Sequence, residues 1–130
     1  MGFRDQLERQ HGIAIGIADD VIEAYKSYKE GSPSLGKSII GDLAKIRKAR
    51  EVLKADKKIC DKKFKTIHSI SEASAVDLEN VKGMYKGSHI ALSSMANKAE
   101  KFYKLIKGKA KADVVKQAYD DVVSFKKIIL

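Results

Sequence analysis

The chain contains no tryptophan, one proline (Pro33) and one cysteine (Cys60). A single cysteine cannot form an intrachain disulfide, which excludes a disulfide-stapled secreted domain and favours a reducing interior. The composition is 44% hydrophobic and 33% charged. It is too apolar for a disordered chain and too rich in helix formers for a sheet, so we expect an all-α protein.

Long apolar segments are also missing. No stretch approaches the roughly 18 consecutive apolar residues that a membrane-spanning helix requires. The first ten residues lack the apolar core of a signal peptide. We therefore expect a soluble, cytoplasmic protein. With 130 residues, the chain is expected to form one domain over residues 1–130.

Acidic residues are outnumbered, because 26 Lys and Arg face 17 Asp and Glu and leave a net charge of +9. This excess favours a polyanionic partner such as nucleic acid or an anionic membrane surface, although lysines can also simply solvate the outer faces of helices. Lysine predominates over arginine, which suits contact with a nucleic-acid backbone better than bidentate recognition of base edges.

From Leu78 to Ile106, mostly apolar residues recur at alternating spacings of three and four without interruption, which predicts a long amphipathic helix. Its seam consists of Leu78, Val81, Tyr85, Ser88, Leu92, Met95, Ala99, Phe102 and Ile106. Similar steps predict helices over about 4–30, from 35 or 38 to about 70, and from about 112 onward. Gly-Ser-Pro-Ser at 31–34 predicts a turn, and Gly108 is expected to end the third helix as a C′ glycine. The economical arrangement is an antiparallel up-down four-helix bundle with two long central helices and a shorter C-terminal helix.

Two glycine-containing segments complicate the first and third helices. Residues 12–18 alternate like a strand, but they have no strand partner in the sequence, so we expect helix. Gly12 and Gly16 form a G-x-x-x-G motif, and Gly83 and Gly87 form a second one. In a soluble bundle, this motif is interpreted as a tight helix crossing.

The helix lengths do not match. The second and third helices are each expected to be about 50 Å long and the fourth about 28 Å, so the far end of the central hairpin lacks cover from the fourth helix. This exposed end is a candidate partner-binding or oligomer surface. Its residues are Phe64, Ile67, Ile70, Met84 and Tyr85. A bend in the second helix, or cover from Phe3 and Leu7, is the alternative.

Basic side chains concentrate on one flank of the second helix and on the polar face of the third. The first group is Arg47, Lys54, Lys58, Lys62 and Lys65, and the second is Lys86, Lys101 and Lys104. We take these eight residues as the candidate nucleic-acid-binding set.

Motifs for catalysis or cofactors are weak. Glu8 and His11 have the Glu-x-x-His spacing of di-iron bundles, but the sequence has no second copy of this motif. We therefore expect no metal and interpret His11 as a half-buried core residue. Cys60 falls on an apolar face and is expected to be structural, whereas His89 is expected at the surface. A complete phosphate-binding loop is absent. We expect a protein that is not an enzyme and carries no cofactor.

Two functions remain. The first is a basic bundle that binds a polyanion, a nucleic-acid backbone, independently of sequence in an assembly or packaging role. The alternative is a protein interaction module, an adaptor or immunity-type protein that uses its exposed apolar end.

Overall fold

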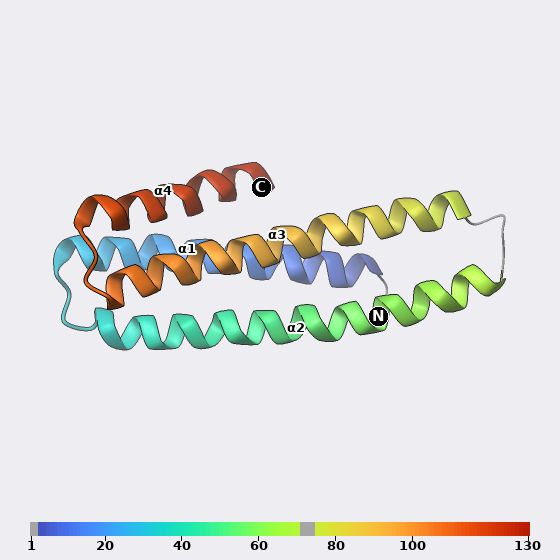
Figure 1. The fold of residues 1–130 in the computed structure, drawn as a ribbon, viewed down its shortest axis with the longest axis horizontal. Coiled ribbons are helices and arrows are strands. Elements are labelled where there is room, and N and C mark those ends of the chain that lie inside the picture. The colour runs from blue at the N-terminus through green and yellow to red at the C-terminus, as the bar shows by residue number, and fades with distance from the viewer. Residues whose placement is uncertain (1–2, 71–74) are drawn as a thin grey trace.

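The computed structural model describes the backbone of residues 3–70 and 75–130 and the side chains of residues 5–62 and 82–130. These residues form four helices: α1 (Phe3–Glu30), α2 (Leu35–Ile70), α3 (Ala75–Lys107) and α4 (Ala112–Ile129). Each helix runs antiparallel to the one before it (Figure 1). The predicted all-α antiparallel bundle with a shorter C-terminal helix is therefore confirmed. Residues 12–18 are helical, so the strand alternative is wrong.

Helices α1 and α3 end in the same hydrogen-bonded motif. After α1, the Ser32 N–H bonds to the Ser27 carbonyl at 3.0 Å and Gly31 has a φ of 66°. After α3, the Ala110 N–H bonds to the Leu105 carbonyl at 2.9 Å, and the left-handed residue is Lys109, with a φ of 54°. The expectation that Gly108 fills this C′ position is wrong by one residue, because the motif sets the left-handed residue one step before its final N–H donor.

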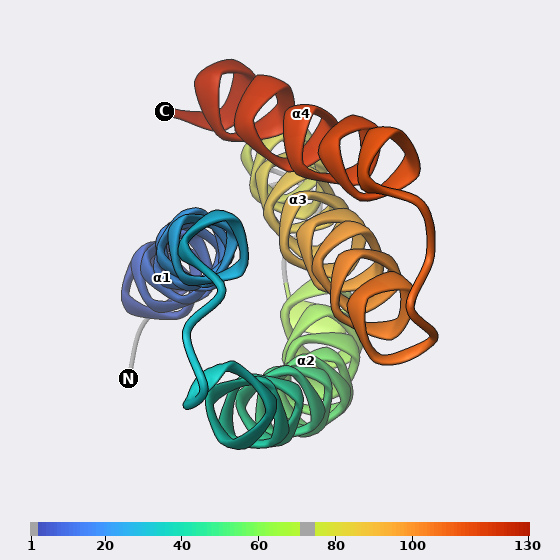
Figure 2. The same cartoon turned by 90° about the vertical axis from the view of Figure 1, so that its left-hand side faces the viewer.

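Helices α1 and α3 each pack against all three other helices, whereas the described parts of α2 and α4 do not touch each other. Figure 2 shows α1 within the concave side of an arc formed by α2, α3 and α4. The core lies where these inner sides meet, and its largest fully buried side chains are Tyr103, Phe102, Ile39, Ile46, Leu92 and Met95. Each large apolar side chain buried here contributes about 1.5–3 kcal/mol to folding. This arrangement leaves the sides of α2 and α3 that are remote from α1 without a covering helix.

The α2–α3 hairpin extends beyond the start of α1 and beyond the end of α4 (Figure 1). The G-x-x-x-G motifs do not mark helix crossings. A Cβ added at Gly12, Gly16, Gly83 or Gly87 would meet no atom within 4 Å, and all four glycines are exposed. The motif has this meaning only when it faces another helix, and here both copies face outward.

Candidate nucleic-acid interface

The Arg50 guanidinium fixes the register between α2 and α3. It donates hydrogen bonds to the Glu100 carboxylate at 2.5 Å and to the Asn97 side-chain oxygen at 2.9 Å. Because the two helices are antiparallel, this register places Arg47 level with the turn that begins at Glu100, and Lys62 level with Lys86. Basic residues from the two helices therefore lie at matching levels along the hairpin.

Asp56 defines the side of α2 that faces α1, because its carboxylate bonds to Arg9 and Gln10 of α1. Lys54 and Lys58 are two residues before and after Asp56, so each lies about 160° from it around the helix. Arg47, nine residues before Asp56, lies about 180° from it. All three side chains are exposed. They occupy the side of α2 opposite α1.

The same reasoning orients α3. Ser88 faces α1, because its hydroxyl donates a hydrogen bond to the Gln10 side-chain oxygen at 3.1 Å. Lys86 and Lys104 lie about 160° from Ser88 around the helix, and Lys101 lies about 140° from it. These three lysines are exposed and also point away from α1.

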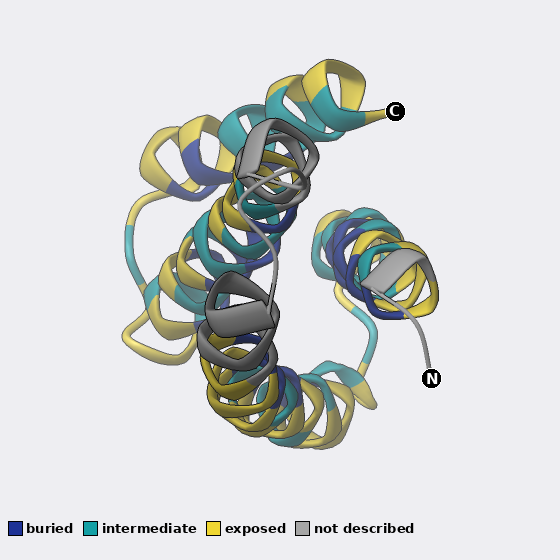
Figure 3. Cartoon of the chain, turned by 90° about the vertical axis from the view of Figure 1, so that its right-hand side faces the viewer, coloured by how far each residue is buried: buried dark blue, intermediate teal, exposed yellow. Residues whose placement is uncertain are grey.

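We call this shared surface of α2 and α3 the hairpin face. Its described basic residues are Arg47, Lys54, Lys58, Lys62, Lys86, Lys101 and Lys104. Of these, Lys62 lies about 120° from Asp56 around α2, at the edge of the face. Figure 3 shows exposed residues along the side of both helices that is remote from α1. The Lys65 side chain lies outside the described residues. The structure thus brings the other seven members of the predicted set to one side of the hairpin.

Charge is divided unequally between the helices. Helix α2 carries eleven basic and four acidic side chains, and α3 carries six and three. Helix α1 carries four and six, and α4 carries three of each. The whole positive excess of the helical segments therefore resides on the α2–α3 hairpin.

The ion pairs of the described residues mostly involve basic side chains outside the hairpin face. Asp20 pairs with Lys45 at 3.2 Å, and the adjacent Asp19 pairs with Lys126 of α4 at 2.7 Å. On the hairpin face, Lys104 pairs with Glu100 at 3.5 Å. The hydrogen bond from Arg50 lowers the pKa of Glu100. The Glu100 carboxylate therefore remains ionised between Arg50 and Lys104. Within the described side chains, no ion pair involves Arg47, Lys54, Lys58, Lys86 or Lys101.

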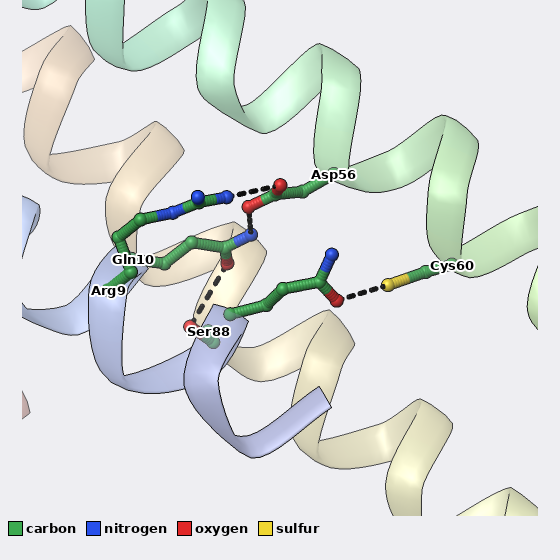
Figure 4. A network of polar contacts seen from close by, with 6 residues as sticks. Arg9, Gln10, Asp56, Cys60 and Ser88 are labelled. Atoms are coloured by element: carbon green, nitrogen blue, oxygen red, sulfur yellow. Dashed lines mark hydrogen bonds and ion pairs between the residues drawn. The ribbon is translucent and has the colours of Figure 1, made fainter. Parts of the chain in front are cut away.

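A buried polar layer holds α1 against this hairpin (Figure 4). Asp56 is 2% exposed and Gln10 is fully buried. Asp56 accepts hydrogen bonds from the Arg9 guanidinium and from the Gln10 amide, the second at 3.0 Å. Gln10 in turn accepts the bond from Ser88. One glutamine therefore connects all three helices, and a shift of α1 by one residue would break both of its bonds.

Next to this layer, the Cys60 thiol donates a hydrogen bond to the Gln6 side-chain oxygen at 3.1 Å, with both residues buried. The structural assignment of Cys60 agrees with this environment, although the contact is polar rather than apolar. Tyr85 is also buried here, and desolvation raises the pKa of its hydroxyl to about 12. Tyr85 is thus an interior residue, and its predicted place on a partner surface is wrong. Its place on the apolar seam of α3 turns it toward Gln10 of α1 and Cys60 of α2 rather than outward.

Among the described side chains, the other residue of the predicted partner surface and His89 differ in how far they are exposed. Met84 is 63% exposed, whereas the side chains of Phe64, Ile67 and Ile70 lie outside the described residues. His89 is half-buried with its ring 6.1 Å from that of Tyr85, so its predicted surface position is wrong. His89 and Glu100 lie on the same flank of α3, and Arg50 of α2 bonds to Glu100 there.

His11 is exposed rather than part of the core, and its Nε2 lies 2.7 Å from the Ile129 carbonyl oxygen, so we infer that it donates there. The core row of α1 instead passes through Gln10, which places His11 on the flank beside α4. Among the described residues, no group of three or more His, Cys, Asp and Glu side chains could hold a metal ion.

Sequence reasoning missed the buried polar residues, although a signal was present. Gln10, Ala14, Ile17, Val21 and Ala24 form a buried four-three ladder. The sequence interpretation followed a different ladder, which begins with Leu7 and His11. On α2, Leu53 and Cys60 are seven residues apart, so a heptad seam needs a member between them, and Asp56 is that member.

Comparison of the chain with protein-family models, with curated proteins and with solved structures finds no match. In the part of the chain that the structure describes, no helix is both long enough and apolar enough to cross a membrane.

Proposed function

We propose that this protein is a non-enzymatic helical bundle that binds the phosphate backbone of a nucleic acid, independently of sequence, in an assembly or packaging role. One observation carries the proposal. Exposed basic side chains from α2 and α3 share the side of the hairpin opposite α1, and five of the described ones make no ion pair. Such cations neutralise phosphates and release counterions, which drives sequence-independent binding.

The residue types on this face support contact with phosphates rather than bases. Six of its seven described basic residues are lysines, which act as mobile point charges. Arg50, a residue with the fork geometry that reads guanine, is engaged with Glu100 and Asn97. The proposed contact therefore carries no preference for a base sequence.

An anionic membrane is the competing polyanion. Binding in a membrane interface requires a continuous apolar face that enters the acyl boundary. Among the described side chains, the exposed apolar residues on the hairpin face are Ile40 and Ile90, and they are isolated from each other. Ile90 lies near the level of Lys58, and Ile40 is 18 residues from Lys58 along α2, or about 27 Å. This separation favours a nucleic acid over a lipid surface.

The test is a salt titration of binding to mixed-sequence DNA and RNA, with anionic phospholipid vesicles in parallel. With three to five phosphate contacts, we expect log Kd to change linearly with log salt, with a slope of about 3 to 4.5 in magnitude on a duplex. Binding to vesicles without binding to nucleic acid at low salt would overturn the proposal, as would no binding to either.

A protein interaction module is the second candidate function. It is favoured by the extension of the hairpin beyond α1 and α4 (Figure 1) and by the exposure of Met84 near that end. If this surface joins copies of the chain, sedimentation equilibrium shows an oligomer and Met84→Asp dissociates it while the circular dichroism stays helical. A monomer at all concentrations would remove self-association as its use.

A further inference from the structure

We infer that the hairpin face is built for double-stranded rather than single-stranded nucleic acid. This inference rests on the proposed function and adds the form of the partner to it. It comes from two observations: which side chains the described part of the face lacks, and how its cations are spaced.

Proteins that bind single strands combine positive charge with exposed aromatic rings on which the bases stack. No described aromatic side chain here is exposed. The rings are used internally: Tyr25 stacks on Tyr119 with centroids 4.0 Å apart, and Phe102 packs edge-on to Tyr103 at 5.4 Å. Tyr85 of α3 is buried beside Gln10 of α1 and Cys60 of α2. The described part of the hairpin face therefore offers charge without a stacking platform.

The cations stand in long rows on nearly straight helices (Figure 1). Arg47 to Lys62 spans about 22 Å along α2, and Lys86 to Lys104 spans about 27 Å along α3. These lengths correspond to about seven or eight base pairs of duplex at 3.4 Å each. A duplex presents its phosphates along a stiff axis, so no ordering is required. A single strand must be straightened along the rows, and the described part of the face offers no stacking that would offset that loss of entropy.

Counterion release sets the size of the preference. Each phosphate contact contributes about 0.9 to the salt slope on a duplex and about 0.7 on a single strand. For four contacts the difference is about 0.8, which amounts to a roughly sixfold preference for duplex at 0.1 M salt relative to 1 M. The missing stacking interactions act in the same direction.

The experiment measures the affinity of the full chain for a 20-base-pair mixed-sequence duplex and for an unstructured single strand with the same number of phosphates, by fluorescence anisotropy at salt concentrations from 0.1 M to 1 M. We expect tighter binding to the duplex, with a duplex to single-strand affinity ratio about sixfold higher at 0.1 M salt than at 1 M. Equal or tighter binding to the single strand would overturn the inference and leave the proposed function standing. If the protein binds neither the duplex nor the single strand at low salt, the proposed function itself is overturned.

A variant that adds a ring tests the reason for the preference. Ile90 lies two residues after Ser88, on the side of α3 opposite α1, and is 57% exposed. Ile90→Tyr should tighten single-strand binding about fivefold and change duplex affinity little. Ile90→Val, which adds no ring, is the matched control. If Ile90→Tyr leaves the ratio of the two affinities unchanged, the missing stacking platform is not the cause of the preference.

Discussion

Asp56→Ala removes the acceptor at the centre of the polar layer. The carboxylate is 2% exposed and binds both Arg9 and Gln10. Its loss leaves the fully buried Gln10 amide without an acceptor, which costs about 1–3 kcal/mol. The Arg9 side chain is 40% exposed, so water can solvate its guanidinium and its contribution is small. We expect a loss of about 1–3 kcal/mol in the free energy of unfolding.

Urea unfolding followed by circular dichroism measures this loss, with an unchanged m-value as the sign that only stability has changed. Asp56→Asn keeps an acceptor for Gln10 but loses the charge, and we expect it to cost about 1 kcal/mol. Glu51→Ala is the matched control, because it removes an exposed acid from the same helix, and its effect should stay within about 0.5 kcal/mol. A result for Asp56→Ala as small as that of the control would refute the buried polar layer.

Two further predictions concern packing and pH. Gly12→Ala and Gly16→Ala should each stabilise the protein by about 0.5–1 kcal/mol in urea unfolding, because both glycines lie inside α1 with open space at the Cβ position; destabilisation would restore the interpretation as a tight crossing. Burial raises the pKa of Tyr85 to about 12, whereas a tyrosine in the unfolded chain titrates near 10. The unfolded state therefore releases its proton first, and stability should fall as pH rises from about 10 to 12, with a smaller fall in Tyr85→Phe; an identical fall in that variant would contradict this role for Tyr85.

The four helices were predictable because each carries an apolar row at helical spacing. These rows, together with the turn signal at 31–34 and Gly108 after the third helix, indicated their number, order and approximate ends. Periodicity does not determine which of two overlapping ladders faces the core, however. On α1, Leu7 and His11 are more apolar as a pair than Gln6 and Gln10, yet the glutamines are buried because partners on α2 and α3 satisfy their polar groups.

The candidate interface could be predicted only in part, for a related reason. Spacing within one helix groups Arg47, Lys54 and Lys58, but it cannot tell which residues of another helix lie beside them. That information comes from the bridge of Arg50 to Glu100 and Asn97, a contact between residues about 50 positions apart. The two glycine motifs failed similarly, since whether a small residue faces a neighbouring helix is a property of the packed bundle.

The hairpin face is tested most directly by comparing the salt dependence of duplex binding in two triple variants that each remove three positive charges. Lys54, Lys58 and Lys86 are changed to Gln in the first, and the exposed Lys26, Lys116 and Lys127 of α1 and α4 are changed in the second. We predict that the first variant flattens the slope of log affinity against log salt by about 2.7, at about 0.9 per contact, and that the second leaves it nearly unchanged. Equal flattening in both variants would show that only the overall charge matters and would contradict a binding face on α2 and α3.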